Sequence, residues 1–114
     1  MPTYPTFNDG PPAGVLNYTV KSAAYTAAPG DYVLGNASSA AFSVTLPAVG
    51  AGGPVTVKKD PTSDATGNSI TVVTNDSSKI DGVTGATGVK ISAPGDSLTL
   101  NSNGTAWFVT YNLA

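Results

Sequence analysis

The chain has 114 residues, of which only 11% are charged, and its five lysines and seven aspartates give a formal net charge of −2. It contains no cysteine, histidine, arginine or glutamate, which excludes disulfides, thiolate and imidazole metal sites, and histidine-based catalysis. Without clustered cations we expect no nucleic-acid binding, and without an apolar run of about 18 residues we expect no membrane-spanning segment. We predict one small domain that is not an enzyme and needs no cofactor.

Residues 1–15 hold four of the nine prolines and no strand alternation, which predicts an extended N-terminal arm ahead of a body over residues 16–114. Proline keeps such a segment extended, and aromatic side chains supply buried anchors at interfaces. The arm residues that we expect to contact a partner are Tyr4, Pro5, Phe7, Pro11 and Pro12. The alternative is a terminal tail without a role. Because the arm lacks the basic start and apolar run of a signal peptide, we expect synthesis in the cytoplasm.

Short segments with an apolar residue at every second position follow one another through the body. Period two with β-branched and aromatic residues is typical of strands, and no window has a helical period. The predicted strands span residues 17–21, 31–35, 41–46, 54–59, 69–74, 88–92, 96–101 and 105–112. Their close spacing, with Gly- and Pro-rich breaks between them, predicts an all-β fold: a single small antiparallel β-sandwich or barrel-like domain.

Two kinds of turn are visible between these strands. The tetrapeptide Ala-Pro-Gly-Asp occurs at residues 28–31 and again at 93–96, each time before a strand, which predicts two similar turns. Asp81 and Gly82 follow Ile80, which predicts a tight turn directly after a buried isoleucine.

Asn103-Gly104 is the strongest hairpin signal in the chain, because a type I′ turn needs positive φ at both central residues. A two-residue loop pairs Ser102 with Thr105, Leu100 with Trp107 and Leu98 with Val109, and puts the large residues of these pairs on a core face. Phe108 then lies among hydroxyl side chains on the opposite face. It is either a single exposed residue or part of a subunit contact.

One loop has a composition that could bind a cation. Asp60, Asp64 and Asn68 lie within it, and calcium prefers such oxygen ligands. Their spacing is not that of an EF-hand, so a solvated hairpin loop is favoured over a metal site. Lys58 and Lys59 could hold an anionic partner, but two lysines at a strand end more often protect a sheet edge.

Other motifs are weaker. Residues 49–53 are Gly-rich like a phosphate-binding loop but lack its Gly-Lys-Ser/Thr ending and a following helix. Asp76 and Asp81 lie beside turns, which favours turn formation over a glycosidase pair. Tyrosines can stack on sugars, although core or interface packing explains them equally well; these are Tyr4, Tyr18, Tyr25 and Tyr32. No catalytic constellation remains.

A set of short motifs runs in order through residues 17–110. They are Tyr18-Thr-Val-Lys, Gly30-Asp-Tyr-Val-Leu34, Ser43-Val-Thr-Leu-Pro47, Val55-Thr-Val-Lys-Lys59, Ser69-Ile-Thr-Val72, Ile80-Asp-Gly82, Asp96-Ser-Leu-Thr-Leu100 and Ser102-Asn-Gly-Thr-Ala-Trp107. In this order they resemble a β-rich module of tailed-bacteriophage virion surface proteins, which include head-fibre, capsid decoration and tail-fibre proteins. The resemblance implies a non-enzymatic virion module that commonly trimerises. Because Met1 opens the arm and the chain is short, it resembles a decoration or head-fibre protein more than a tail fibre.

The resemblance implies a capsid decoration (cement) protein: a homotrimer on the outer capsid surface of the virion, with the major capsid protein as its partner. The alternative is a tail-fibre or head-fibre module that binds carbohydrate or protein at the host surface. A decoration protein should need its arm and base, whereas a receptor binder should need exposed loops and aromatic clusters. An enzyme is the third class, and the missing bases count against it.

Overall fold

The computed structural model describes residues 16–113, and these residues form strands and turns without a helix. Consequently no helix in this range could cross a membrane. The strands are β1 (Thr19–Lys21), β2 (Tyr25–Thr26), β3 (Tyr32–Gly35), β4 (Phe42–Thr45), β5 (Val55–Lys59), β6 (Ile70–Val73), β7 (Lys79–Ile80), β8 (Val83–Thr84), β9 (Val89–Ile91), β10 (Ser97–Ser102) and β11 (Trp107–Leu113). The predicted all-β class is confirmed for this part of the chain.

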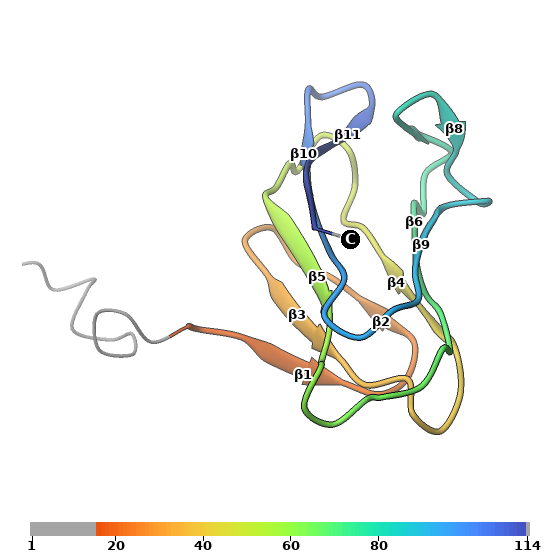
Figure 1. Ribbon diagram of the computed structural model, residues 1–114. Coiled ribbons are helices and arrows are strands. Elements are labelled where there is room, and N and C mark those ends of the chain that lie inside the picture. The colour runs from red at the N-terminus through yellow and green to blue at the C-terminus, as the bar shows by residue number, and fades with distance from the viewer. Residues whose placement is uncertain (1–15, 114) are drawn as a thin grey trace, which may run out of the picture.

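The strands build two facing sheets (Figure 1). One has the order β1-β3-β5-β10-β11-β7-β8 and the other the order β2-β4-β6-β9. Every strand predicted from the sequence is present, and no end differs by more than two residues. The two-residue strands β2, β7 and β8 were not predicted, because so short a segment has no alternation to detect.

Both sheets are mixed, so the expectation of a purely antiparallel fold is wrong. From β1 to β6, consecutive strands alternate between the two sheets, and each strand therefore pairs with the strand two places along the chain. Between a strand and the next strand of the same sheet, the chain reverses direction twice, once on entering the other sheet and once on returning. The pairs are therefore parallel; they are β1–β3, β3–β5, β2–β4 and β4–β6. A turn signal shows that the chain reverses, but it does not show which sheet the next strand joins.

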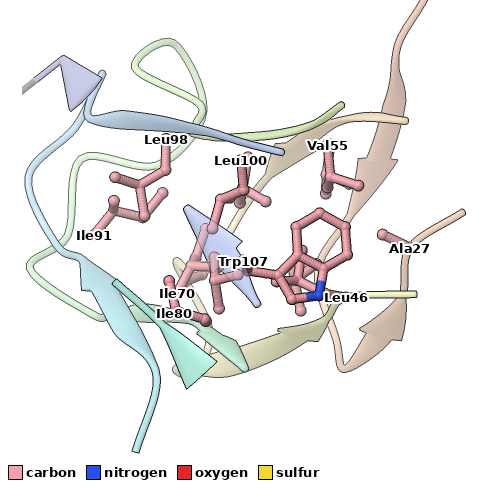
Figure 2. Packing of buried hydrophobic residues seen from close by; sticks show 14 residues of the cluster. Ala27, Leu46, Val55, Ile70, Ile80, Ile91, Leu98, Leu100 and Trp107 are labelled. Atoms are coloured by element: carbon pink, nitrogen blue, oxygen red, sulfur yellow. The ribbon is translucent and has the colours of Figure 1, made fainter. Parts of the chain in front are cut away.

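The core lies between the sheets, where period-two alternation directs side chains from both of them. Figure 2 shows Trp107 within this cluster, with its ring fully buried. Its members are Ala27, Val33, Ala37, Val44, Leu46, Val55, Val57, Ile70, Val72, Ile80, Ile91, Leu98, Leu100 and Trp107. Each buried Val, Leu or Ile stabilises the fold by about 1.5–3 kcal/mol relative to an exposed one, which makes this cluster the main source of stability.

The β10–β11 hairpin has a longer loop than predicted. Ser102 pairs with Trp107, and Leu100 pairs with Val109. The loop is therefore four residues, Asn103 to Ala106. The Asn103 side chain accepts hydrogen bonds from the backbone N–H groups of Thr105 and Ala106, and this capping favours the longer loop over a two-residue type I′ turn. The shift is two residues, so Leu98, Leu100 and Trp107 still face the core as expected.

The two Ala-Pro-Gly-Asp segments form the same turn, as predicted. In each, the Asp N–H donates to the Ala carbonyl and the Asp carboxylate accepts from the Ala N–H. Gly30 and Gly95 have φ values of 88° and 87°, which the third position of a type II turn requires. The turns lie at opposite ends of β5, because Gly30 donates to Pro54 and Gly95 donates to Lys59.

The Asp81-Gly82 turn is also confirmed. Both residues have positive φ, as in a type I′ turn, and Ile80 pairs with Val83 across it. Ile80 is fully buried. Asp81 also accepts a hydrogen bond from the N–H of Val109, which ties this small hairpin to β11.

Candidate interaction face and the buried ion pair

The arm residues predicted to contact a partner lie outside the residues that the structure describes; they are Tyr4, Pro5, Phe7, Pro11 and Pro12. Phe108, the predicted subunit contact, lies on β11 and is 41% exposed. It pairs with Asn101 on the outer face of the seven-stranded sheet, the polar side on which the sequence placed it.

A β-bulge changes which residues share this face with Phe108. The β10–β11 register shifts between Leu100, which pairs with Val109, and Thr99, which pairs with Tyr111. Strict alternation would direct Tyr111 and Leu113 toward the core, but the extra residue, Thr110, reverses them. Thr99 faces outward, and so its partner Tyr111 does as well.

The outer face of β11 therefore carries three exposed large apolar side chains, Phe108, Tyr111 and Leu113, which we call the β11 stripe. Without the bulge, the outer face of β11 would carry Phe108, Thr110 and Asn112. With it, Tyr111 and Leu113 replace the last two. On the side of β7, β11 is joined by the Trp107–Ile80 pair and by Asp81, whose N–H donates to the Trp107 carbonyl and whose carboxylate accepts from the N–H of Val109.

A second apolar area lies on the same sheet at the border formed by β1. Val20 on β1 is 58% exposed and pairs with the half-buried Leu34 of β3 on the outer face. Tyr18, the residue before β1, is 50% exposed. Tyr18, Val20 and Leu34 form what we call the β1 patch.

The strands between the β11 stripe and the β1 patch present small polar side chains. Thr56 of β5 and Thr99 of β10 share a hydrogen bond of 2.9 Å on this face. Lys58 also lies here, and its ammonium group donates to the carbonyl of Gly95 at 2.9 Å. The centre of the face is therefore largely neutral.

The four-stranded sheet provides a contrast. Its outer face carries Ser43, Thr45, Thr71, Val73 and Lys90, as the register of β4, β6 and β9 requires. The exposed large hydrophobic side chains of residues 16–113 are Leu16, Tyr18, Val20, Val83, Phe108, Tyr111 and Leu113, and none belongs to this second sheet. Four of them, Val20, Phe108, Tyr111 and Leu113, lie on the outer face of the seven-stranded sheet.

The loop after β5 is not the solvated hairpin that was expected. It connects strands of different sheets, and its Asp64 is fully buried against the fully buried Lys59, with 2.6 Å between Nζ and Oδ2. Asp64 also accepts hydrogen bonds from the N–H of Ala37 at 2.7 Å and from the hydroxyl of Thr66 at 2.7 Å. Asn68 donates to the Ala37 carbonyl, so the whole loop is held to the segment after β3.

This pair is electrostatically well satisfied. Burial alone would raise the pKa of Asp64, but the hydrogen bonds from Lys59, Thr66 and the N–H of Ala37 outweigh burial and hold that pKa well below its usual range. Asp64 is therefore a fixed carboxylate whose acceptor positions are already used. A carboxylate in this state is a structural anion and a poor general acid or base.

The lysines at the end of β5 do not protect a sheet edge, which corrects the favoured interpretation. β5 lies between β3 and β10 in the interior of its sheet. Lys59 continues the core-facing alternation of Val55 and Val57, and it therefore points inward to Asp64. The period-two pattern of β5 indicated that Lys59 points inward, but nothing in the sequence identified Asp64 as the partner of its ammonium group.

The other oxygen ligands of this loop are also engaged. Asp60 accepts hydrogen bonds from the Ser63 hydroxyl and from the N–H and hydroxyl of Thr62, and these lower its pKa. Within residues 16–113, no three carboxylates gather as a metal site would require.

The remaining candidates have structural roles in turns and packing. Asp76 accepts from the Ser78 hydroxyl and from the N–H of Val49, which lowers its pKa and joins the Gly-rich segment at 49–53 to the turn before β7. That segment leads into strand β5, whereas a phosphate loop leads into a helix. Asp76 and Asp81 thus form turns, as the sequence favoured.

The tyrosines divide between core and surface. Tyr25 packs against the core, donates to Asp31 at 2.7 Å and lies under the Lys21 ammonium, 4.4 Å from the ring centroid. The hydrogen bond to Asp31, burial and the charge of that carboxylate raise the pKa of Tyr25. Tyr18 and the half-buried Tyr32 lie toward the outer face of the seven-stranded sheet.

No protein-family model, curated protein or solved structure matches this chain. The functional proposal therefore rests on the residues themselves and on where the fold places them.

Proposed function

We propose that the chain is a bacteriophage virion structural protein, a capsid decoration protein that binds the major capsid protein on the outer surface as a homotrimer. The ordered set of motifs over residues 17–110, which resembles the module of phage virion surface proteins, is the observation that carries this proposal. The proposed function involves neither catalysis nor a cofactor.

The motif residues lie at positions that build the body, which supports a shared fold. Leu46 and Trp107 are fully buried in the core. Asp81 and Gly82 form the turn between β7 and β8, and Asp96 closes the turn before β10. Motif residues at core and turn positions are those that a shared fold would require, and the virion role is the function that the resemblance implies.

The surface composition supports assembly with identical copies. With only 11% charged residues, the body can pack against a neighbour without removing many charges from water. Phe108 belongs to the proposed subunit contact. Three copies docked together on a threefold capsid position would combine weak single contacts into strong binding.

The arm supplies the proposed capsid contact. Its prolines reduce the entropy lost on docking, and its aromatic side chains suit buried pockets on a partner. The residues that make this contact in the proposal are Tyr4, Pro5, Phe7, Pro11 and Pro12.

Binding to undecorated capsids tests the proposal. The full chain should bind them, and electron microscopy of such particles should show it at regular lattice positions. Deletion of residues 2–12 should leave the β-type circular dichroism spectrum unchanged and abolish binding. A truncated chain that still decorates capsids with full occupancy would assign attachment to the β body. A full chain that does not bind would overturn the proposal.

A fibre module that binds host-surface carbohydrate is the second candidate. The exposed aromatic rings of Tyr18, Phe108 and Tyr111 beside threonine hydroxyls favour it, because such rings stack on sugars. A glycan array distinguishes the two: a fibre module should bind glycans and lose binding on Tyr111→Ala, whereas a decoration protein should bind capsids and no glycan.

A further inference from the structure

The β11 stripe and the β1 patch lie on one sheet, the patch at the border formed by β1 and the stripe on the fifth strand of the order. Four strand spacings separate them in the order β1-β3-β5-β10-β11, which corresponds to roughly 19 Å at about 4.8 Å per spacing. Each contains large apolar side chains that are at least 41% exposed within residues 16–113. Two uncovered apolar areas on one neutral face require a common explanation.

The twist of the sheet prevents one partner from covering both areas in the same way. Adjacent strands rotate by about 20–25°, so over four steps β1 and β11 differ in direction by about 80–100°. Figure 1 shows this change in direction, with β1 running roughly horizontally and β10 and β11 roughly vertically. The β11 stripe and the β1 patch therefore need separate neighbours.

We propose that the two areas are the complementary halves of a contact between copies of this chain, in which the β11 stripe of one copy packs on the β1 patch of the next. Such a head-to-tail contact uses both areas once in every copy, and it closes into a ring when the rotation between copies permits. A twofold contact of stripe on stripe would leave every β1 patch exposed to water. The inference deepens the self-assembly in the proposed function and does not depend on capsid binding.

The size of the areas fits this occupant. A large apolar side chain has a surface on the order of 200 Å², so one that is half exposed offers about 100 Å². The β11 stripe and the β1 patch together then contribute about 500 Å², roughly half of the apolar area in a standard interface of about 1,600 Å². The threonines between the two areas provide a neutral rim.

The charges fit as well. Neither area contains a carboxylate or an ammonium group of its own. Lys58, which pairs with Leu34 of the β1 patch, donates its ammonium to the Gly95 carbonyl, and the exposed Lys79 lies on β7, the strand beside β11. Docking one area on the other therefore buries no charged side chain that belongs to either area. An aspartate introduced into either area should, by the same reasoning, block the contact.

The experiment compares two exposed-site variants of the full chain, Leu113→Asp in the β11 stripe and Val20→Asp in the β1 patch. Thr26→Asp is the matched control, because Thr26 is an exposed strand residue of the other sheet. Sedimentation velocity should give a closed oligomer for the parent chain and the control, and a monomer for each of the two variants. For a trimer this is a threefold fall in mass.

An equimolar mixture of the two variants distinguishes head-to-tail from twofold contacts. The Leu113→Asp copy keeps its β1 patch and the Val20→Asp copy keeps its β11 stripe, so the mixture should form heterodimers of twice the monomer mass at about 100 μM. Because the parent chain has no cysteine, mixed Val20→Cys and Leu113→Cys copies should also form a 20–113 disulfide under mild oxidation, which Thr26→Cys should not.

A parent chain that is monomeric at about 100 μM would overturn the inference. So would a mixture that yields neither heterodimers nor the mixed disulfide. Capsid binding is measured in parallel: a chain that binds capsids without this complementation rejects the head-to-tail contact alone. A chain that assembles as described but binds no capsid rejects the virion proposal alone.

Discussion

Replacing Asp64 by alanine removes the anion that faces the Lys59 ammonium. Both side chains are fully buried, and their 2.6 Å contact is the only ion pair among residues 16–113. The substitution leaves an unpaired ammonium beneath the loop and also deprives the backbone N–H of Ala37 of its acceptor. We therefore expect a large loss of stability from a residue that lies far from the centre of the core.

The magnitude follows from burial. Removing one partner of a buried ion pair typically costs about 3–5 kcal/mol, because the other charge remains without water. The neighbouring loop residues are exposed and can move to admit water, which favours the lower end, about 3 kcal/mol. For a domain of this size, that corresponds to a fall in Tm of roughly 12–24 °C, out of a total stability of about 5–15 kcal/mol.

The assay is thermal unfolding followed by circular dichroism at a fixed protein concentration, since self-association also shifts Tm. Asp60→Ala is the control, because Asp60 belongs to the same loop but makes only local hydrogen bonds with its side chain. The double variant Lys59→Met with Asp64→Ala should recover more than half of the loss, because no charge remains buried. An Asp64→Ala variant no less stable than Asp60→Ala would refute the reasoning, as would a double variant worse than the single one.

Three further outcomes are expected. Asp60, Asp64 and Asp76 have folded-state pKa values below the unfolded value of about 4. The stability that these carboxylates provide is therefore complete above about pH 4 and is lost as the pH falls through their folded-state pKa values. Tm should decrease below about pH 4, and a rise in Tm on acidification would contradict this. Gly30→Ala should cost about 1–2 kcal/mol in urea unfolding, because φ at this site is 88° with open space around it, whereas Gly50→Ala, with open space and no positive φ, should change stability by less than about 0.5 kcal/mol. A chelator should leave Tm unchanged, and a fall of several degrees would instead indicate a cation bound in the loop at residues 60–68.

Local chemistry made the strands and several turns predictable. Apolar and polar residues that alternate over four to six positions identify a strand wherever one of its faces is buried, as in β5, β6 and β10. The Ala-Pro-Gly-Asp turns and the Asp81-Gly82 turn depend only on proline, on glycine at positive φ, and on an aspartate that bonds its own backbone. These interactions lie within four residues of each other, so the sequence contains all of their partners.

The candidate interaction face was only partly predictable. Phe108 was found because it interrupts a row of hydroxyl side chains on one face of the hairpin. Tyr111 and Leu113 were missed because their direction depends on the bulge at Thr110, and no residue type marks that extra position. The β1 patch was missed because the position of β1 at the border of a sheet is a property of strand order.

The sequence by itself determined that the body is all-β, where most of its strands lie, and which face of the last hairpin is directed to the core. Only the tertiary structure decided that successive strands alternate between two mixed sheets, that Lys59 meets Asp64, and that the β11 stripe and the β1 patch lie on one sheet. The physical reason is the distance along the chain between the residues that interact. Alternation and turn formation are settled between near neighbours in the chain, whereas sheet membership, register across a bulge and the partner of a buried charge are settled by packing between segments far apart in sequence.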